Sequence, residues 1–160
     1  MIVVADASPL HYLVLIGEIE ILPALFGLVL APPAVMSELA HERTPAAVRE
    51  WVAKPPAWLR IQPPTRIVPA LPAMLGAGER EAIAVAEEVR ADLLLIDDGS
   101  GRREARRRNL SIRGTLGTLG LAARHGLTDL PRAVARLRTT NFRVSEDLIE
   151  SILDEEAGRK

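Results

Sequence analysis

Short apolar runs alternate with longer amphipathic segments along the whole chain. The apolar runs lie at 2–5, 28–30, 59–62, 93–96 and 110–113, and the run at 93–96 is the best candidate for a central strand. Helical periodicity and capping signals predict helices at 8–17, 18–25, 32–41, 45–52, 79–90, 99–108, 115–125, 130–138 and 145–156. Strands that alternate with helices predict a central parallel sheet covered on both faces, a three-layer α/β/α fold.

Proline residues mark where several of these elements begin or end. Ser8 is expected to be the N-cap of the first helix, with Pro9 in its first turn. Six prolines between residues 54 and 72 predict a connection with one extended piece, and this segment is too apolar to be a loose linker. We therefore expect a single domain over residues 1–160, with C-terminal helices at about 130–157 packed on it.

Composition narrows the classes of function. Aromatic residues make up only 3% of the 160 residues, which argues against a protein that stacks bases on aromatic platforms. The absence of cysteine excludes a disulfide scaffold, a thiolate zinc site and a cysteine nucleophile. The three histidines show no metal-ligand spacing, so a zinc hydrolase is not expected either.

No segment reaches the roughly 18 apolar residues that a membrane span requires. The first residues, MIVVADAS, indicate a buried strand rather than a secretory signal. Together with the absence of cysteine, this leads us to expect a cytoplasmic protein with no membrane partner.

Acidic residues stand where predicted strands end and predicted helices begin. Asp6 ends the first apolar run, and Asp97 and Asp98 end the run at 93–96. If both strands belong to one parallel sheet, these acids emerge at its carboxyl edge, where such sheets bind ligands. Glu38 flanks the apolar stripe of its helix, and Glu79 lies in the first turn of its own.

Several carboxylates in one place repel each other unless some stay protonated or a cation neutralises them. Mg²⁺ and Mn²⁺ prefer oxygen ligands, and two such ions can activate water and stabilise the leaving oxygen of a phosphodiester. The sequence has no GxSxG motif, Walker loop or cysteine that would supply another nucleophile or phosphate site. The pattern predicts a divalent metal site, with Glu81 as a weaker rival of Glu79.

Each acid also has a purely structural interpretation. Asp6 is suited to cap a helix, Glu79 to favour a helix dipole, and Glu38 to be a solvated helix acid. The pair Asp97 and Asp98 is suited to a turn and a cap. Their joint placement, rather than any single residue, favours a functional site.

Five blocks of sequence, in this order, resemble the PIN domain. They are VVADASPL, PPAVMSEL, LGAGEREAIAVA, LLLIDDGSGRREA and RGTLGTLGLAARHGL, and they run from about Ile2 to Leu127. The resemblance is greatest to a branch common in bacteria and archaea, near the VapC-type toxins of toxin–antitoxin pairs. It implies a Mg²⁺- or Mn²⁺-dependent endoribonuclease with an RNA substrate and an antitoxin partner, and we also expect a homodimer.

The resemblance assigns roles to individual acids. Asp6, Glu38, Glu79 and Asp97 resemble the metal-binding and catalytic acids of the family. Asp98, next to Asp97, leaves open which of the two is the ligand. The sequence departs from the usual toxin pattern in two places. Glu79 stands where aspartate is usual, and Ile-Asp-Asp-Gly replaces Thr-x-Asp after the strand at 93–96.

Two hydroxyl residues also match the family pattern. Ser8 resembles the hydroxyl that supports the first acid, and Thr115 resembles a residue that serves the site.

Five arginines fall within seven positions in the helix predicted at 99–108, although the net charge of the chain is −1. Arg102, Arg103, Arg106 and Arg107 are expected to share one basic face that contacts RNA phosphates. The alternative is a solvated helix in which Glu104 partly compensates the charge.

Other functions remain open at this point. One is a non-catalytic PIN-like module that binds RNA or an antitoxin without cutting. Another is a phospho-acceptor signalling domain, but that class needs paired acids after the first strand and a lysine after the last. The only lysines are Lys54 and Lys160, neither at a predicted strand end. The apolar stripe of the helix at 145–156 is expected to dock on the chain itself rather than on a partner.

Overall fold

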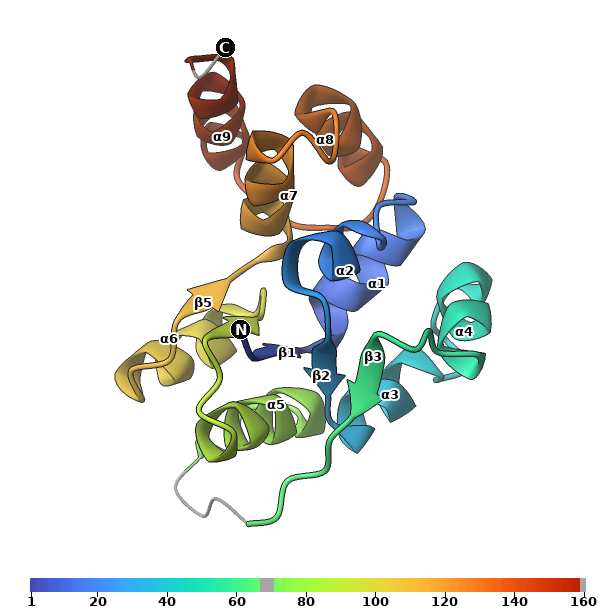
Figure 1. The fold of residues 1–160 in the computed structure, drawn as a ribbon, viewed down its shortest axis with the longest axis vertical. Coiled ribbons are helices and arrows are strands. Elements are labelled where there is room, and N and C mark those ends of the chain that lie inside the picture. Colours follow the sequence, from blue (N-terminus) through green and yellow to red (C-terminus); the bar gives the residue numbers. More distant parts are fainter. Residues whose placement is uncertain (67–70, 159–160) are drawn as a thin grey trace.

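Five parallel strands form the centre of the molecule in the computed structural model, which describes residues 1–66 and 71–158 (Figure 1). Their order in the sheet is β3-β2-β1-β4-β5, and every neighbouring pair is parallel. The strands are β1 (Val3–Ala5), β2 (Val29–Ala31), β3 (Leu59–Ile61), β4 (Leu93–Leu95) and β5 (Ile112–Arg113). The three-layer α/β/α fold predicted from the sequence is confirmed.

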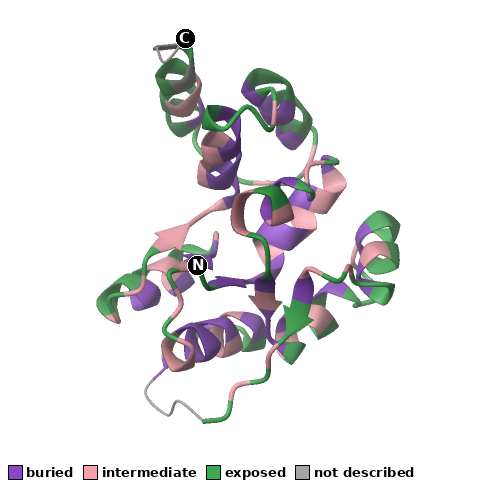
Figure 2. Ribbon diagram, viewed as in Figure 1, coloured by how far each residue is buried: buried purple, intermediate pink, exposed green. Residues whose placement is uncertain are grey.

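Alternate residues of the short strands face two separate cores, as the period of two along a strand requires. Val3 and Ala5 of β1 face the larger core, and Val4 faces the smaller one. The smaller core is closed by α5 (Ala77–Glu88) and α6 (Gly99–Arg107). The larger core is built with α1 (Ala7–Leu15), α2 (Ile21–Phe26), α3 (Pro33–Leu39), α4 (Ala46–Ala53) and α7 (Thr115–Arg124). Buried residues follow the three central strands, β2, β1 and β4, and the inner sides of these helices (Figure 2).

The two C-terminal helices, α8 (Leu130–Arg138) and α9 (Glu146–Gly158), pack on α7 and on each other beyond the end of the sheet (Figure 1). Ile149 of α9 is 2% exposed and belongs to the larger core. Arg138 and Glu146 form an ion pair of 2.8 Å between α8 and α9. The C-terminal helices therefore pack on the rest of the chain, as expected. That residues 1–160 form a single domain stays a prediction.

The predicted elements are present with ends that differ by a few residues, and one predicted cap is wrong. Asp6, not Ser8, is the N-cap of α1, because β1 ends at Ala5 and the chain turns into the helix at once. Ser8 is thus the second residue of the helix. The helix predicted at 18–25 begins only at Ile21, after a turn in which Gly17 has a φ of 74°. Part of the proline-rich connection, 67–70, lies outside the described residues.

The strand order places a topological switch at the middle of the sheet. From β1 the chain moves outward through β2 and β3, then returns to pair β4 with the other side of β1. Ala5 is in register with Leu95, and the backbone N–H of Asp6 donates to the carbonyl of Leu95 at 2.9 Å. The carboxyl ends of β1 and β4 therefore meet where open α/β sheets bind ligands.

None of the helices within the described ranges combines the length and hydropathy needed to cross a bilayer.

Candidate functional site

Asp6 lies at the carboxyl end of β1 and is only 2% exposed. Although it is the N-cap of α1, its side chain makes no capping hydrogen bond. Its Oδ1 atom is buried and has no hydrogen-bond partner among the described residues. A buried carboxylate oxygen without a partner is costly, so the capping interpretation does not account for this side chain.

Three other predicted site acids act electrostatically on Asp6. Burial and the negative charges of Glu79, Glu38 and Asp97 raise the pKa of Asp6 to about 8, while a hydrogen bond from the Ala7 backbone N–H acts in the opposite direction. The fold thus brings these four acids into one electrostatic environment, although they come from four separate segments of the chain.

Glu38 approaches Asp6 from α3, near a glycine of α5. A Cβ atom on Gly78 would lie 3.3 Å from Oδ1 of Asp6 and 3.8 Å from Oε1 of Glu38. Glu38 as a whole residue is exposed, but its carboxyl end points toward this crowded place. Partial burial of the carboxyl group and the charge of Glu79 raise the pKa of Glu38. Gly78 therefore leaves the room that both carboxylates use.

Glu79 lies in the first turn of α5, and its carboxylate folds back toward the start of that helix. Its Oε2 atom lies 2.6 Å from the position that a Cβ on Gly76 would take. Glu81, the rival acid of the same helix, has a different role. Its Oε1 atom accepts the backbone N–H of Ala34 at 2.9 Å and so ties the start of α3 to α5. Of the two, Glu79 is the one that raises the pKa of Asp6.

Asp97 and Asp98 have different partners, and Asp97 accepts hydrogen bonds from three donors. Thr115 donates its backbone N–H to Oδ1 at 2.7 Å and its hydroxyl to Oδ2 at 2.6 Å. Ser8 donates its hydroxyl to Oδ2 at 2.8 Å. Asp98 is exposed and caps α6, accepting the backbone N–H of Gly101 at 2.8 Å. The structure thus places Asp97, not Asp98, toward Asp6, and Ser8 bonds the fourth acid rather than the first.

Gly114 has a steric role that sequence reasoning missed. A Cβ atom at this position would lie 2.8 Å from Oδ1 of Asp97 and 2.9 Å from Nη1 of Arg102. Any larger residue would therefore displace the acid or the arginine. The available signal, at Gly78 as at Gly114, was a glycine directly before a predicted helix.

The predicted basic face of α6 divides into separate roles. Arg102 donates Nη1 to the carbonyl of Ile96 at 3.0 Å and lies on the site side of the helix. Arg103 and Arg106 are exposed, and Arg103 bonds the hydroxyl of Ser100 at 3.2 Å.

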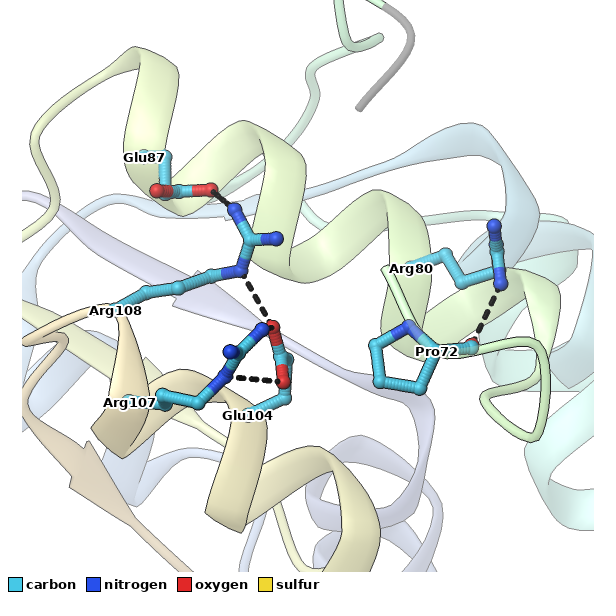
Figure 3. Close-up of polar contacts among 6 residues, drawn as sticks. All are labelled: Pro72, Arg80, Glu87, Glu104, Arg107 and Arg108. Atoms are coloured by element: carbon cyan, nitrogen blue, oxygen red, sulfur yellow. Dashed lines mark hydrogen bonds and ion pairs between the residues drawn. The ribbon is translucent and has the colours of Figure 1, made fainter. Parts of the chain in front are cut away.

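Arg107 points instead to Glu104, which is 6% exposed and also binds Arg108 (Figure 3). Glu104 is therefore a buried partner of two arginines rather than a partial compensation for the whole basic face. RNA contact by Arg102, Arg103, Arg106 and Arg107 stays a prediction.

The acids form an open arrangement rather than a closed cage. Within residues 1–66 and 71–158, no three acidic or histidine side chains lie close enough to form a ready-made metal site. The carboxylate of Glu79 lies near Gly76, and that of Asp97 is bonded by Thr115 and Ser8. Mg²⁺ keeps several water ligands and is often held by only one or two carboxylates. The unpartnered Oδ1 of Asp6 and the oxygen-only donor set fit such an ion.

A family model described as a PIN domain matches residues 2–158 of the chain. A search of curated proteins and a search of solved structures gave no match.

Proposed function

The chain belongs to the PIN-domain family, whose members are generally nucleases, and from this premise we propose that it is a Mg²⁺- or Mn²⁺-dependent endoribonuclease. The observation that carries the proposal is the buried, unpartnered Oδ1 of Asp6, surrounded by the charges of three further acids. Acids that repel each other do not stabilise the fold, and no arginine or lysine among the described residues pairs with Oδ1 of Asp6. A divalent ion would neutralise such a group of carboxylates.

In this proposal, the ion binds among Asp6, Glu38, Glu79 and Asp97, which hold it directly or through its water ligands. A bound Mg²⁺ or Mn²⁺ supplies Lewis acidity and a water molecule of lowered pKa for attack on phosphorus. Asp6 gives up its proton to become a ligand, and Gly78 keeps the space beside it open.

The supporting residues fix the fourth acid. Ser8 and Thr115 orient both oxygens of Asp97 by hydrogen bonds, which is how an outer layer of donors usually positions a ligand. In this proposal, Arg102, which lies beside Asp97, attracts the phosphate group of the substrate.

We further propose that the protein is the toxin of a toxin–antitoxin pair and acts in the cytoplasm as a homodimer. This extension is supported by the VapC-like order of the sequence blocks. Expression of the wild-type chain in a bacterial host is expected to arrest growth, whereas Asp6→Asn is expected not to. Equal growth of both cultures would contradict the toxin assignment.

The direct test of the nuclease is a cleavage time course on single-stranded and structured RNA. Cleavage is expected with Mn²⁺, and is expected to be lost with EDTA and in Asp6→Asn. Asp147→Asn, an exposed acid on α9, is the matched control and is expected to cut like the wild type. Full activity of Asp6→Asn would show that the site is assigned wrongly.

A second candidate is a PIN module that binds RNA or an antitoxin without cutting. The observation in its favour is that the described residues contain no ready-made metal cage. This candidate predicts RNA or antitoxin binding that is unchanged by EDTA and by Asp6→Asn, with no cleavage of any RNA. The nuclease proposal predicts cleavage that needs both the metal and Asp6.

A further inference from the structure

Residue types that are rare in this chain gather in a groove beside the acids. The chain has three histidines and one tyrosine. His11, His41 and Tyr12 all line a groove of about 790 Å³, which also includes Ser8 and Glu38. His11 and Tyr12 lie three and four residues after Ser8, and so share its face of α1. The groove therefore continues from the acidic site along one side of α1.

Segments that are distant in the sequence build its walls. One wall is α1, another is the stretch that follows α3, and the third is the connection between α8 and α9. The residues that the last two contribute include His41, Arg43, Thr44, Thr139, Thr140 and Asn141. The hydroxyl of Thr44 bonds the carbonyl of Glu38 at 3.0 Å, which fixes the second wall to the site helix.

The tyrosine ring is held rigidly in this groove. Its hydroxyl donates to Oδ1 of Asn141 at 2.8 Å. The ring of Phe142 meets it edge-on at a centroid distance of 4.9 Å, and the ring of His11 lies at 4.7 Å in a tilted arrangement. A rigid aromatic side chain offers a flat contact surface at low entropic cost. Asn141, which accepts through Oδ1, still carries two N–H donors on its amide nitrogen.

The charge of the groove favours a base over a run of phosphates. Arg43 is the only arginine or lysine among its lining residues, all of which belong to the described part of the chain. Burial lowers the pKa of His11, which favours the uncharged ring. His41 accepts the backbone N–H of Arg43 through Nδ1 at 3.1 Å. A groove that tracks a nucleic-acid backbone carries many more cations than this.

We propose that this groove binds the base of a nucleotide that flanks the scissile phosphate of single-stranded RNA. The inference rests on the proposed nuclease function, because it takes the acids beside Ser8 as the place of cutting. The base stacks on the ring of Tyr12, and the ring of His11, tilted by 53° to that of Tyr12, lies beside it. Asn141 donates to the edge of the base, and Arg43 meets the adjoining phosphate. A base in a duplex is already stacked and paired, so the groove selects unpaired nucleotides.

The test is photo-cross-linking of single-stranded RNA that carries 5-iodouridine at each position in turn. The wild-type protein is irradiated with the RNA in Ca²⁺, which takes oxygen ligands, and the cross-linked residue is identified by mass spectrometry. In parallel, cleavage in Mn²⁺ is measured on RNAs with every base at each position that flanks the cut.

Cross-links are expected at His11 or Tyr12, from one position of the RNA. His11→Ala and Tyr12→Leu are expected to lower their yield by about 5- to 10-fold, the loss of roughly one stacking contact. Tyr12→Phe keeps the ring and is expected to keep the cross-link. His125→Ala, an exposed histidine at the end of α7, is the matched control. If Tyr12→Leu does not fold, His11→Ala decides.

The outcomes separate this inference from the nuclease proposal. Cross-links at His11 or Tyr12 without cleavage of any RNA would support the groove and contradict the nuclease. Cleavage with cross-links elsewhere, and with the same base preference in His11→Ala as in the wild type, would support the nuclease and overturn the groove. Cross-links of equal yield with duplex RNA would overturn the selection of unpaired bases. No cross-link with any RNA would overturn the inference and leave the groove to a ligand of another class.

Discussion

Among the described residues, two carboxylates are buried, and their surroundings are opposite. Asp6 is 2% exposed at the carboxyl edge of the sheet, and Glu104 is 6% exposed between α5 and α6. Burial and three neighbouring acids raise the pKa of Asp6 to about 8. Hydrogen bonds and charges from Arg107 and Arg108 hold the pKa of Glu104 at about 2. The ionised carboxylate is thus destabilised at Asp6 and stabilised at Glu104.

The surroundings of Glu104 show how this chain satisfies a buried acid when only the fold requires it. Glu104 accepts hydrogen bonds from Arg107 at 3.1 and 2.9 Å and from Arg108 at 2.8 Å. Arg108 also reaches Glu87 of α5 at 2.7 Å, so the network joins two helices (Figure 3). At Asp6 the chain supplies no such partner among the described residues, and adds acids instead. The difference indicates that the cluster around Asp6 serves a ligand rather than stability.

The largest expected effect is on catalysis. Asp6→Asn removes a carboxylate that the ion needs as a ligand and is expected to lower RNA cleavage by at least about 100-fold, since even outer-layer residues of metal sites are worth 10- to 100-fold. Initial rates in Mn²⁺ measure this, with Asp147→Asn as the control and a circular dichroism spectrum as the check of folding. A variant that is folded and retains more than about a tenth of the activity would contradict the central role of Asp6.

The next effect concerns stability and pH in the absence of divalent ions. Because the pKa of Asp6 is about 8 in the folded state and its ordinary value is 3.8, the folded state keeps a proton that the unfolded chain has lost between these values. The contribution of Asp6 to the free energy of unfolding should then fall by about 1.4 kcal/mol per pH unit as pH rises from about 5 to about 7. The raised pKa of Glu38 acts in the same direction, and the lowered pKa of His11 acts in the opposite one.

Urea unfolding at several pH values measures this slope. Asp6→Asn is expected to flatten it, because asparagine does not titrate. Equal slopes in the wild type and Asp6→Asn would show that the pKa of Asp6 is not raised in the folded protein.

A smaller effect is expected from the residues that orient Asp97. Thr115→Val removes the hydroxyl that bonds Oδ2 of Asp97 but keeps the shape of the side chain. We expect cleavage to fall by about 10-fold, the lower end for an outer-layer residue of a metal site, while Thr115→Ser keeps most of the activity. If the valine and serine variants lose activity equally, the hydroxyl is not what Asp97 needs.

The smallest effect on activity is expected at the other buried acid. Glu104→Gln leaves Arg107 and Arg108 without their charged partner, so the melting temperature should fall. At a temperature where the variant is folded, its rate of RNA cleavage should stay within about twofold of the wild-type rate. The contacts of Glu104 join α6 to α5 and stabilise the fold, but they do not stabilise the transition state of cleavage. Glu150→Gln, an exposed acid on α9, is the control for stability. A large loss of cleavage in folded Glu104→Gln would mean that the two buried acids are coupled.

That Asp6 and Asp97 lie near each other could be predicted from the sequence, because the carboxyl ends of parallel strands lie at one edge of a sheet. It was not sufficient to choose between Asp97 and Asp98, or between Glu79 and Glu81. Neighbouring residues of a turn, or residues two apart on a helix, differ in direction only once the packing of other elements is known. Asp98 caps α6 and Glu81 caps α3, and both partners are backbone groups that no pattern of side chains identifies.

The groove beside α1 could not be predicted from the sequence for a related reason. Its walls come from α1, from the stretch after α3 and from the connection before α9. Only the tertiary packing brings Asn141 to Tyr12, at a separation of 129 residues. The low aromatic content argued against base stacking as a general property, but it does not determine where the single tyrosine lies.

The most direct test of the metal site is a calorimetric titration of the protein with Mn²⁺ at pH 7, repeated in buffers of different ionisation enthalpy. Because Asp6 is protonated at this pH and a ligand must be deprotonated, binding should release about one proton. Wild type and Glu104→Gln are expected to bind Mn²⁺ with this release, and Asp6→Asn is expected to lose both. Binding by Asp6→Asn with unchanged affinity, or no binding by the wild type, would contradict the assignment of this acid cluster as a metal site.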